Sequence, residues 1–318
     1  MEEKPKPKRD WKKYEAELKR RSVKRINFLF RKPSKGQLEK ELRQMNRSKK
    51  GRVFEIPESV VGFSVFFKTS FHVNDRDLAV FLKKVFGKDV PFRELDHSSI
   101  VKRRQFLNFE VPFDLSKENL EGKTIYFDGT CMRVERGGNY RSRKYGTNVK
   151  YLRIGVFTDD EGSVIDLTIG DEHDPEVEMI REKLPAIEKS GAEAFNSDGV
   201  GSARDIVCRL TKAKIKPIIR ASEAVVESKR NAPPPHLCIK EKKEEELIWD
   251  NYAKAQEDYQ KWRKETGYSM RWVFTEGRFS ALKRMQGEEI FCKTQKAIHD
   301  EVCARFMLLD GNLPEFWA

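Results

Sequence analysis

Apolar residues recur at helical spacing through the first third of the chain. Trp11, Tyr14 and Leu18 lie three or four positions apart among basic residues, and the spacing resumes at Ile26 and Leu29. Such a repeat places the apolar side chains on one face of a helix. The same spacing, with capping residues at the starts, predicts further helices at 36–45, 57–71, 74–86 and 98–107. We therefore expect an all-α N-terminal domain.

The last two of these helices have the outline of a helix-turn-helix. The second helix carries Lys102, Arg103 and Arg104, and in such a motif the second helix lies on DNA. Basic amphipathic helices are also common as solvated surfaces, so this spacing leaves both interpretations open. If the first interpretation is right, these three residues contact DNA.

From about residue 118 the pattern changes to that of strands. Runs rich in β-branched and aromatic residues predict strands at 124–127, 151–157 and 163–169. Helices at 175–189 and 203–214 then alternate with strands at 192–195 and 215–220. Three strands in hairpin order, followed by alternating helices and strands, predict a mixed α/β sheet with flanking helices. That order is the one a ribonuclease H-like fold requires.

Composition excludes several classes of protein. Of the 318 residues, 38% are hydrophobic and 11% aromatic, enough for a buried core. No apolar run is long enough to cross a bilayer, and the first residues lack the apolar segment of a secretory signal. The five cysteines include no CxxC pair, which favours reduced thiols and a cytoplasmic protein. The 36% of charged residues would also suit a thermophilic source.

The formal net charge of +12 is concentrated at the start of the chain. Residues 1–50 hold 19 Lys and Arg against 7 Asp and Glu, so residues 51–318 are balanced at 44 against 44. Concentrated positive charge is typical of a protein that binds a polyanion such as nucleic acid. The alternative is a basic tail that only keeps the protein soluble.

Three acids occupy positions from which their side chains can converge. Asp128 follows the apolar strand TIYF, Asp198 follows the strand AEAFNS, and Glu276 lies on a later helix. Carboxylates are the hard oxygen ligands that divalent cations need, and bound ions relieve the repulsion between clustered negative charges. Two such ions could activate a nucleophile for phosphodiester displacement. Taken singly, an acid after a strand is more often a turn residue.

Basic and aromatic residues accompany these acids. Lys283 follows Glu276 by seven residues, close to two helical turns, so both side chains face the same way. Tyr268 and Arg271 lie one turn apart before Glu276 and could flank the same DNA. The stretch 133–150 has six bases and one acid, and we expect its Arg141, Arg143 and Lys144 to contact DNA.

Three motifs carry a family resemblance. FDGT at 127–130, NSDGV at 196–200 and TGYSMRWVFTEGRFSALKRMQGEE at 266–289 resemble the DDE transposases of bacterial and archaeal insertion sequences. The resemblance implies a ribonuclease H-like catalytic domain and metal ligands at Asp128, Asp198 and Glu276. It places the family's Tyr, Arg, Glu, Lys signature on Tyr268, Arg271, Glu276 and Lys283. In the family the Glu is the fourth residue after the Arg, whereas Glu276 is the fifth residue after Arg271. In a regular helix one extra residue turns the face by about 100°.

The resemblance also implies an organisation and a function. We expect a basic arm at 1–10, a helical DNA-binding domain at 11–117, and a catalytic domain at 118–318 with a helical insertion at about 230–266. The expected protein is a prokaryotic, nucleoid-associated transposase that uses two Mg²⁺ ions, with Mn²⁺ able to substitute. It would bind double-stranded DNA at the inverted-repeat ends of its element and at the target, as a homodimer or larger synaptic complex. A non-catalytic DNA-binding derivative and a metal-dependent nuclease without strand transfer remain as alternatives.

Overall fold

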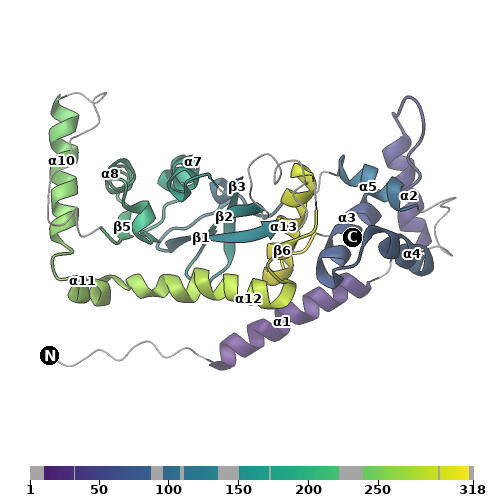
Figure 1. Ribbon diagram of the computed structural model, residues 1–318, viewed down its shortest axis with the longest axis horizontal. Helices are drawn as coiled ribbons and strands as arrows, with labels where there is room; N and C mark the ends of the chain where they lie inside the picture. Colours follow the sequence, from purple (N-terminus) through teal and green to yellow (C-terminus); the bar gives the residue numbers. More distant parts are fainter. Residues whose placement is uncertain are drawn as a thin grey trace. The chain divides into compact units, whose positions relative to one another are not determined.

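The computed structural model describes residues 11–31, 33–86, 96–107, 111–134, 150–171, 173–221, 239–292 and 294–314. The chain divides into two compact units (Figure 1). Unit 1 combines Met1–Val111 with Cys292–Ala318, and unit 2 is Pro112–Phe291. Each unit is described by itself below. Within the described residues, no helix is both long enough and apolar enough to cross a membrane.

Unit 1 is helical in its described part. Its helices are α1 (Trp11–Phe30), α2 (Lys35–Asn46), α3 (Glu58–Phe71), α4 (Asp75–Phe86), α5 (His97–Arg104) and α13 (Gln295–Asp310). The five N-terminal helices lie where the apolar spacing predicts them. Ser34 caps α2 with its side chain, and Asp96 caps α5 in the same way. Residues 87–95, the expected turn between α4 and α5, lie outside the described residues.

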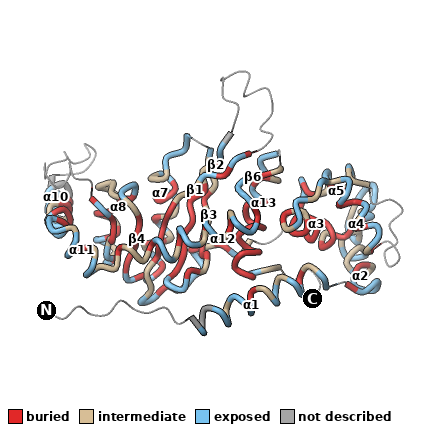
Figure 2. Tube along the Cα trace, turned by 60° about the horizontal axis from the view of Figure 1, so that its bottom comes forward, coloured by how far each residue is buried: buried red, intermediate tan, exposed pale blue. Residues whose placement is uncertain are grey.

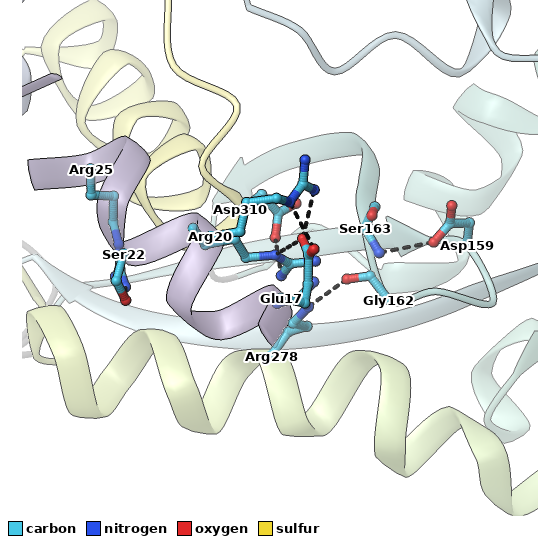
Figure 3. Close-up of polar contacts among 10 residues, drawn as sticks. Glu17, Arg20, Ser22, Arg25, Asp159, Gly162, Ser163, Arg278 and Asp310 are labelled. Carbon is cyan, nitrogen blue, oxygen red and sulfur yellow. Dashed lines mark hydrogen bonds and ion pairs between the residues drawn. The ribbon is translucent and has the colours of Figure 1, made fainter. Parts of the chain in front are cut away.

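Helix α13 packs against α3 and α1. We expected residues 292–318 in the same domain as the sheet, but the contacts of α13 are made inside unit 1. Both α3 and α13 are buried over most of their length, as the red tube of α3 in Figure 2 shows. Glu17 of α1 accepts hydrogen bonds from Arg20 and Arg21, and Arg21 Nη1 lies 3.7 Å from Asp310 Oδ1 of α13 (Figure 3). Ion pairing therefore links α1 to α13 within this unit.

The core of unit 1 is rich in phenylalanine. Phe28 packs edge-on against Phe66 with 5.0 Å between ring centroids, and Phe63 does the same with Phe86 at 5.9 Å. Edge-to-face pairs of this kind add to the stabilisation that aromatic side chains gain from burial. Helices α1, α3 and α4 thus share one aromatic core.

Unit 2 is built on a mixed sheet. Its strands are β1 (Thr124–Val134), β2 (Lys150–Thr158), β3 (Val164–Asp171), β4 (Ala194–Ser197), β5 (Lys216–Ile219) and β6 (Glu289–Ile290). The strand order is β3-β2-β1-β4-β5, and β6 pairs with β1. The first three strands are antiparallel, whereas β4 and β5 run parallel to β1. The predicted mixed α/β sheet is therefore present.

Helices flank the sheet of unit 2. They are α7 (Glu176–Lys189), α8 (Arg204–Lys212), α10 (Ile239–Lys254), α11 (Tyr259–Thr266) and α12 (Gly277–Gln286), with short helical turns η1 (Leu115–Lys117), η2 (Gly199–Ser202), η3 (Tyr268–Met270) and η4 (Trp272–Glu276). Phe195 of β4 joins the main core with α7, α8 and α10, while its neighbour Ala194 packs with Trp262 and Tyr268. Successive residues of β4 thus face different helical layers, as strand geometry requires.

The turn between β2 and β3 is tied to α12. Asp159 Oδ1 accepts the backbone N–H groups of Glu161 and Ser163, so the side chain of Asp159 stabilises this turn. Arg278 of α12 donates from Nε to the main-chain oxygen of Gly162 (Figure 3). The helix that follows Glu276 is therefore fixed against one end of the sheet.

Candidate active site

Asp128 and Asp198 lie level with each other on neighbouring strands. β1 pairs with β4 in parallel from Thr124↔Ala194 to Tyr126↔Asn196, and each acid lies two residues beyond the last pair. The sequence suggested that the first strand ends at Asp128, but β1 continues to Val134 because β2 pairs with it over that whole length. What ends before Asp128 is the pairing with β4, so the two acids occupy the place where these strands separate.

Glu276 reaches this place through a π-helical turn. In η4, the backbone N–H of Gly277 hydrogen-bonds to the oxygen of Trp272, five residues earlier. A π turn absorbs one extra residue within an otherwise regular helix. The rotation of about 100° expected from the five-residue interval is therefore absent. Arg271 Nη1 lies 3.6 Å from Glu276 Oε1, on the same side of the helix.

Arg271 is the counter-ion of the acids. Its Nη1 lies 3.0 Å from Asp128 Oδ2, and the residue is only 7% exposed. The hydroxyl of Thr275 donates to the main-chain oxygen of Arg271 at 2.8 Å and lies 3.4 Å from Asp128 Oδ2. The sequence analysis expected Arg271 to contact DNA; in this structure its charge is directed at Asp128 and Glu276 instead.

Burial and mutual repulsion act on the protonation of Asp128. Burial raises the pKa of Asp128 to about 6, and the charges of Asp198 and Glu276 add to this rise. Arg271 and the N–H of Gly129, which donates to Asp128 Oδ1 at 2.9 Å, lower it in part. The three predicted acids are thus close enough to influence one another, although they come from distant parts of the sequence.

Glu176 is a fourth acid in this neighbourhood. Burial raises the pKa of Glu176, and the charge of Asp198 raises it further. Its carboxylate fills the space in which a Cβ on Gly129 would lie, which places Glu176 directly beside the residue that follows Asp128. The sequence analysis did not select Glu176, because an acid in the first turn of a helix is a common stabilising feature. Its position after Pro175 gave no sign of a site.

Tyr268 packs rather than facing solvent. It is 5% exposed and lies in a cluster with Trp262, at 5.2 Å between ring centroids, and Tyr259. Its main-chain oxygen accepts a hydrogen bond of 3.4 Å from Asn196 Nδ2. In this structure Tyr268 is therefore a packing residue, whereas the sequence predicted that it would flank DNA.

Glu276 and Lys283 line one open pocket of about 530 Å³. Phe279, Ser280, Arg284 and Glu288 complete its wall. The shared orientation that the seven-residue interval predicts is therefore seen. Lys283 Nζ lies 3.3 Å from Glu288 Oε1, which holds the ammonium group near the wall.

The site does not, as it stands, form a metal cage. The chemistry of three carboxylates suits a hard divalent cation. However, in the part of the chain that the structure describes, no three His, Cys, Asp or Glu side chains are grouped closely enough to hold a metal ion. The positive charge between Asp128 and Glu276 is the guanidinium group of Arg271.

The other residues predicted to contact DNA differ in how exposed they are. Lys102 is exposed on α5, and Arg103 is half-buried. Arg104 is only 8% exposed, because it pairs with Asp75 at 2.5 Å and donates to Ser64 at 3.1 Å. Its predicted role on DNA does not fit this buried position. The remaining predicted contacts, Arg141, Arg143 and Lys144, lie outside the described residues.

Comparison with known proteins adds little to this picture. No protein-family model matches the chain, and no curated protein matches it either. Among solved structures, the chain is similar to the Drosophila P element transposase strand transfer complex, with 10% identity and a TM-score of 0.29. That similarity covers 93% of this chain and 71% of the other. A likeness at this score carries no weight for fold or function, so the residues themselves must carry both.

Proposed function

We propose that the chain is a DNA transposase with a ribonuclease H-like catalytic unit. The observation that carries the proposal is the pairing of Arg271 with both Asp128 and Glu276, beside the point where Asp198 follows the neighbouring strand. The strand order, with three antiparallel strands followed by two parallel ones, supports the ribonuclease H-like assignment. The reaction proposed is hydrolysis of a phosphodiester at the element's ends, followed by attack of the freed 3′-OH on target DNA.

The proposed roles follow from where the side chains lie. Lys283, in the pocket beside Glu276, offers an ammonium group to a phosphate of the strand to be cut. Arg271 holds Asp128 and Glu276 together and neutralises part of their charge. We further propose that Asp128, Asp198 and Glu276 would hold Mg²⁺, with Mn²⁺ able to substitute, if Arg271 no longer paired with two of them. Such a cation would supply activation of a nucleophilic oxygen and stabilisation of the leaving oxygen.

The helical unit and the assembly complete the proposal. Unit 1 would bind the inverted-repeat ends through its basic helices, since residues 1–50 carry the whole charge surplus. Strand transfer needs two ends held together, so a homodimer or larger synaptic complex is part of the proposed function.

A substitution that removes one charge but little volume tests the central claim. Glu276→Gln should leave the affinity for duplex DNA nearly unchanged and abolish cleavage in Mg²⁺ or Mn²⁺, because it removes one carboxylate and little volume. The matched control is Glu161→Gln, an exposed acid in the turn between β2 and β3. Cleavage by the Glu276→Gln variant at the rate of the control would remove the proposed catalytic role. Joined products, as opposed to cut ends alone, separate a transposase from a nuclease.

One observation favours a second function. The pairing of Arg271 with two of the acids, in a site that does not form a metal cage, is what a non-catalytic DNA-binding derivative would also show. The same assay decides between the two. Wild-type protein that binds duplex DNA but cuts none at any concentration of Mg²⁺ or Mn²⁺ would establish the second function.

A further inference from the structure

One aromatic ring in unit 1 carries two cations. Lys49 Nζ lies 3.1 Å from the centroid of the Phe54 ring, and Arg103 Cζ lies 4.0 Å from the same centroid. The two charges are therefore at most 7.1 Å apart. Lys49 follows the end of α2, Phe54 lies in the segment before α3, and Arg103 belongs to α5, so three separate parts of the chain meet here.

The ring is held in place by its own backbone. Asn46, the last residue of α2, accepts the N–H of Phe54 at 2.7 Å and donates from Nδ2 to the oxygen of Phe54 at 2.9 Å. Both main-chain groups of Phe54 are thus fixed by one side chain. The charged groups of Lys49 and Arg103 lie over a ring whose backbone is fixed, so less conformational entropy is lost when a ligand binds them.

The two cations form no close ion pair with a carboxylate in the described part of unit 1, although the charges of Glu58 and Glu41 raise the pKa of Arg103 in part. Among the described residues, no ion pair is formed by Lys49 or by Arg103, and Arg103 Nε is buried without a hydrogen-bond partner. Desolvation lowers the pKa of both groups, and the charge of Arg103 also lowers the pKa of Lys49. The neighbouring Arg104 provides the contrast, since Asp75 neutralises it.

More positive charge lies next to this cluster in the sequence. Lys50 follows Lys49, Lys102 precedes Arg103, and both residues are exposed. Neither forms an ion pair within the described part of unit 1. The cluster therefore adjoins a basic surface to which α2 and α5 both contribute.

We propose that Lys49, Phe54 and Arg103 form a phosphate-binding site for the backbone of duplex DNA. Two fixed, partly desolvated charges separated by no more than 7.1 Å can be neutralised together by the anionic oxygens of a phosphodiester strand. The choice of DNA as the polyanion rests on the proposed function. The site replaces the predicted contact through the successive residues Lys102, Arg103 and Arg104, because Arg104 is committed to Asp75 and Arg103 is joined by Lys49.

The test is the salt dependence of DNA binding by the full chain. Binding of a duplex of random sequence is measured in EDTA by fluorescence anisotropy, from about 50 to 200 mM salt. Each lost phosphate contact lowers the slope of log K against log salt by about 0.9, so Lys49→Gln with Arg103→Gln should lower it by about 1.8. Arg52→Gln with Lys19→Gln removes the same charge from residues already paired with Glu55 and Glu15, and this control should lower the slope far less.

A third variant separates the ring from the charges. Phe54→Leu keeps an apolar side chain but removes the aromatic face, so affinity should fall severalfold with the slope retained. Circular dichroism and thermal unfolding show that each variant is folded. Equal slopes for the Lys49/Arg103 variant and the control would overturn the proposal.

Other polyanions provide the remaining outcomes. The same variants are measured against a single-stranded RNA and against vesicles of anionic lipid. A larger loss of affinity for either of these than for duplex DNA would overturn the assignment to DNA. The binding assay contains EDTA and does not depend on catalysis, so its result would stand even if the proposed catalytic function were wrong. In the same way, equal slopes for the variant and the control would not change the result expected for Glu276→Gln.

Discussion

Asp128 is an acid in a position that disfavours its charge. Its pKa is about 6 in the folded protein, against 3.8 for an exposed aspartate, mainly because it is buried. The folded state therefore binds a proton more tightly than the unfolded state does. Stability contributed by this difference is present below the unfolded pKa and is lost as the pH rises towards 6. Above pH 6 the charged form costs on the order of 3 kcal/mol.

Asp128→Asn should therefore stabilise the protein at neutral pH. The amide removes the charge without removing volume, so we expect a higher Tm than wild type at pH 7.5 and nearly equal Tm values at pH 4. Thermal unfolding at a series of pH values measures this directly. The control is Asp250→Asn, at a partly exposed acid of α10. A stability difference that does not change with pH would contradict the assigned electrostatic cause.

The sequence located the acids but not their partners. Asp128 and Asp198 stand out because each follows an apolar strand, and Glu276 because of the signature around it. Arg104 pairs with Asp75, which lies 29 residues away in the sequence, and no local sequence pattern predicts such a contact. Glu176 was missed for the same reason, since its proximity to Asp198 arises only when α7 packs on the sheet.

At the scale of elements, the π turn of η4 decides the geometry of the site. Its hydrogen-bond pattern differs from that of an α-helix by a single inserted residue. The apolar spacing of the sequence does not show that the N–H of Gly277 bonds to the oxygen of Trp272. A count of residues on a regular helix therefore gave the wrong rotation for Arg271. The inserted residue explains why Arg271 and Glu276 form a close pair although they are five residues apart.

Deleting one exposed residue of this turn tests that explanation. Removal of Val273, which is 43% exposed, should convert the π turn to a regular α-helix and keep Arg271 beside Glu276. We expect the free energy of unfolding to change by less than about 1 kcal/mol, since no buried side chain is lost. Insertion of one Ala after Val273 should instead rotate Arg271 away by about 100° and destabilise the unit. Chemical denaturation compares the two; equal losses would argue against a one-residue insertion.

Helix α13 shows a second limit of sequence patterns. Its sequence mixes apolar and charged residues without a single apolar face, because Glu301 and Arg305 are buried together and pair at 2.7 Å. A buried ion pair of this kind makes a core helix look like a solvated one. The periodicity of α3 was informative, whereas that of α13 could not assign it to unit 1.

At the scale of the whole molecule, the charge surplus belongs to helices more than to the arm. Residues 1–10 hold four bases and three acids, so residues 11–50 carry +11 of the net +12. Removal of all fifty residues would be a poor test of DNA binding, because Phe28 and Leu38 are part of the core of unit 1. The arm and the helices must be tested separately.

Deletion of residues 1–10 should therefore have little effect on DNA binding. The described helix α1 begins at Trp11, so unit 1 keeps its core, and the net charge falls by only one. We expect the salt slope for duplex DNA to fall by less than about 1. Lys24→Gln with Lys40→Gln, which removes two exposed charges from α1 and α2, should lower the slope more than the deletion does. If the deletion has the larger effect, the arm itself binds DNA, through its individual bases rather than through its net charge.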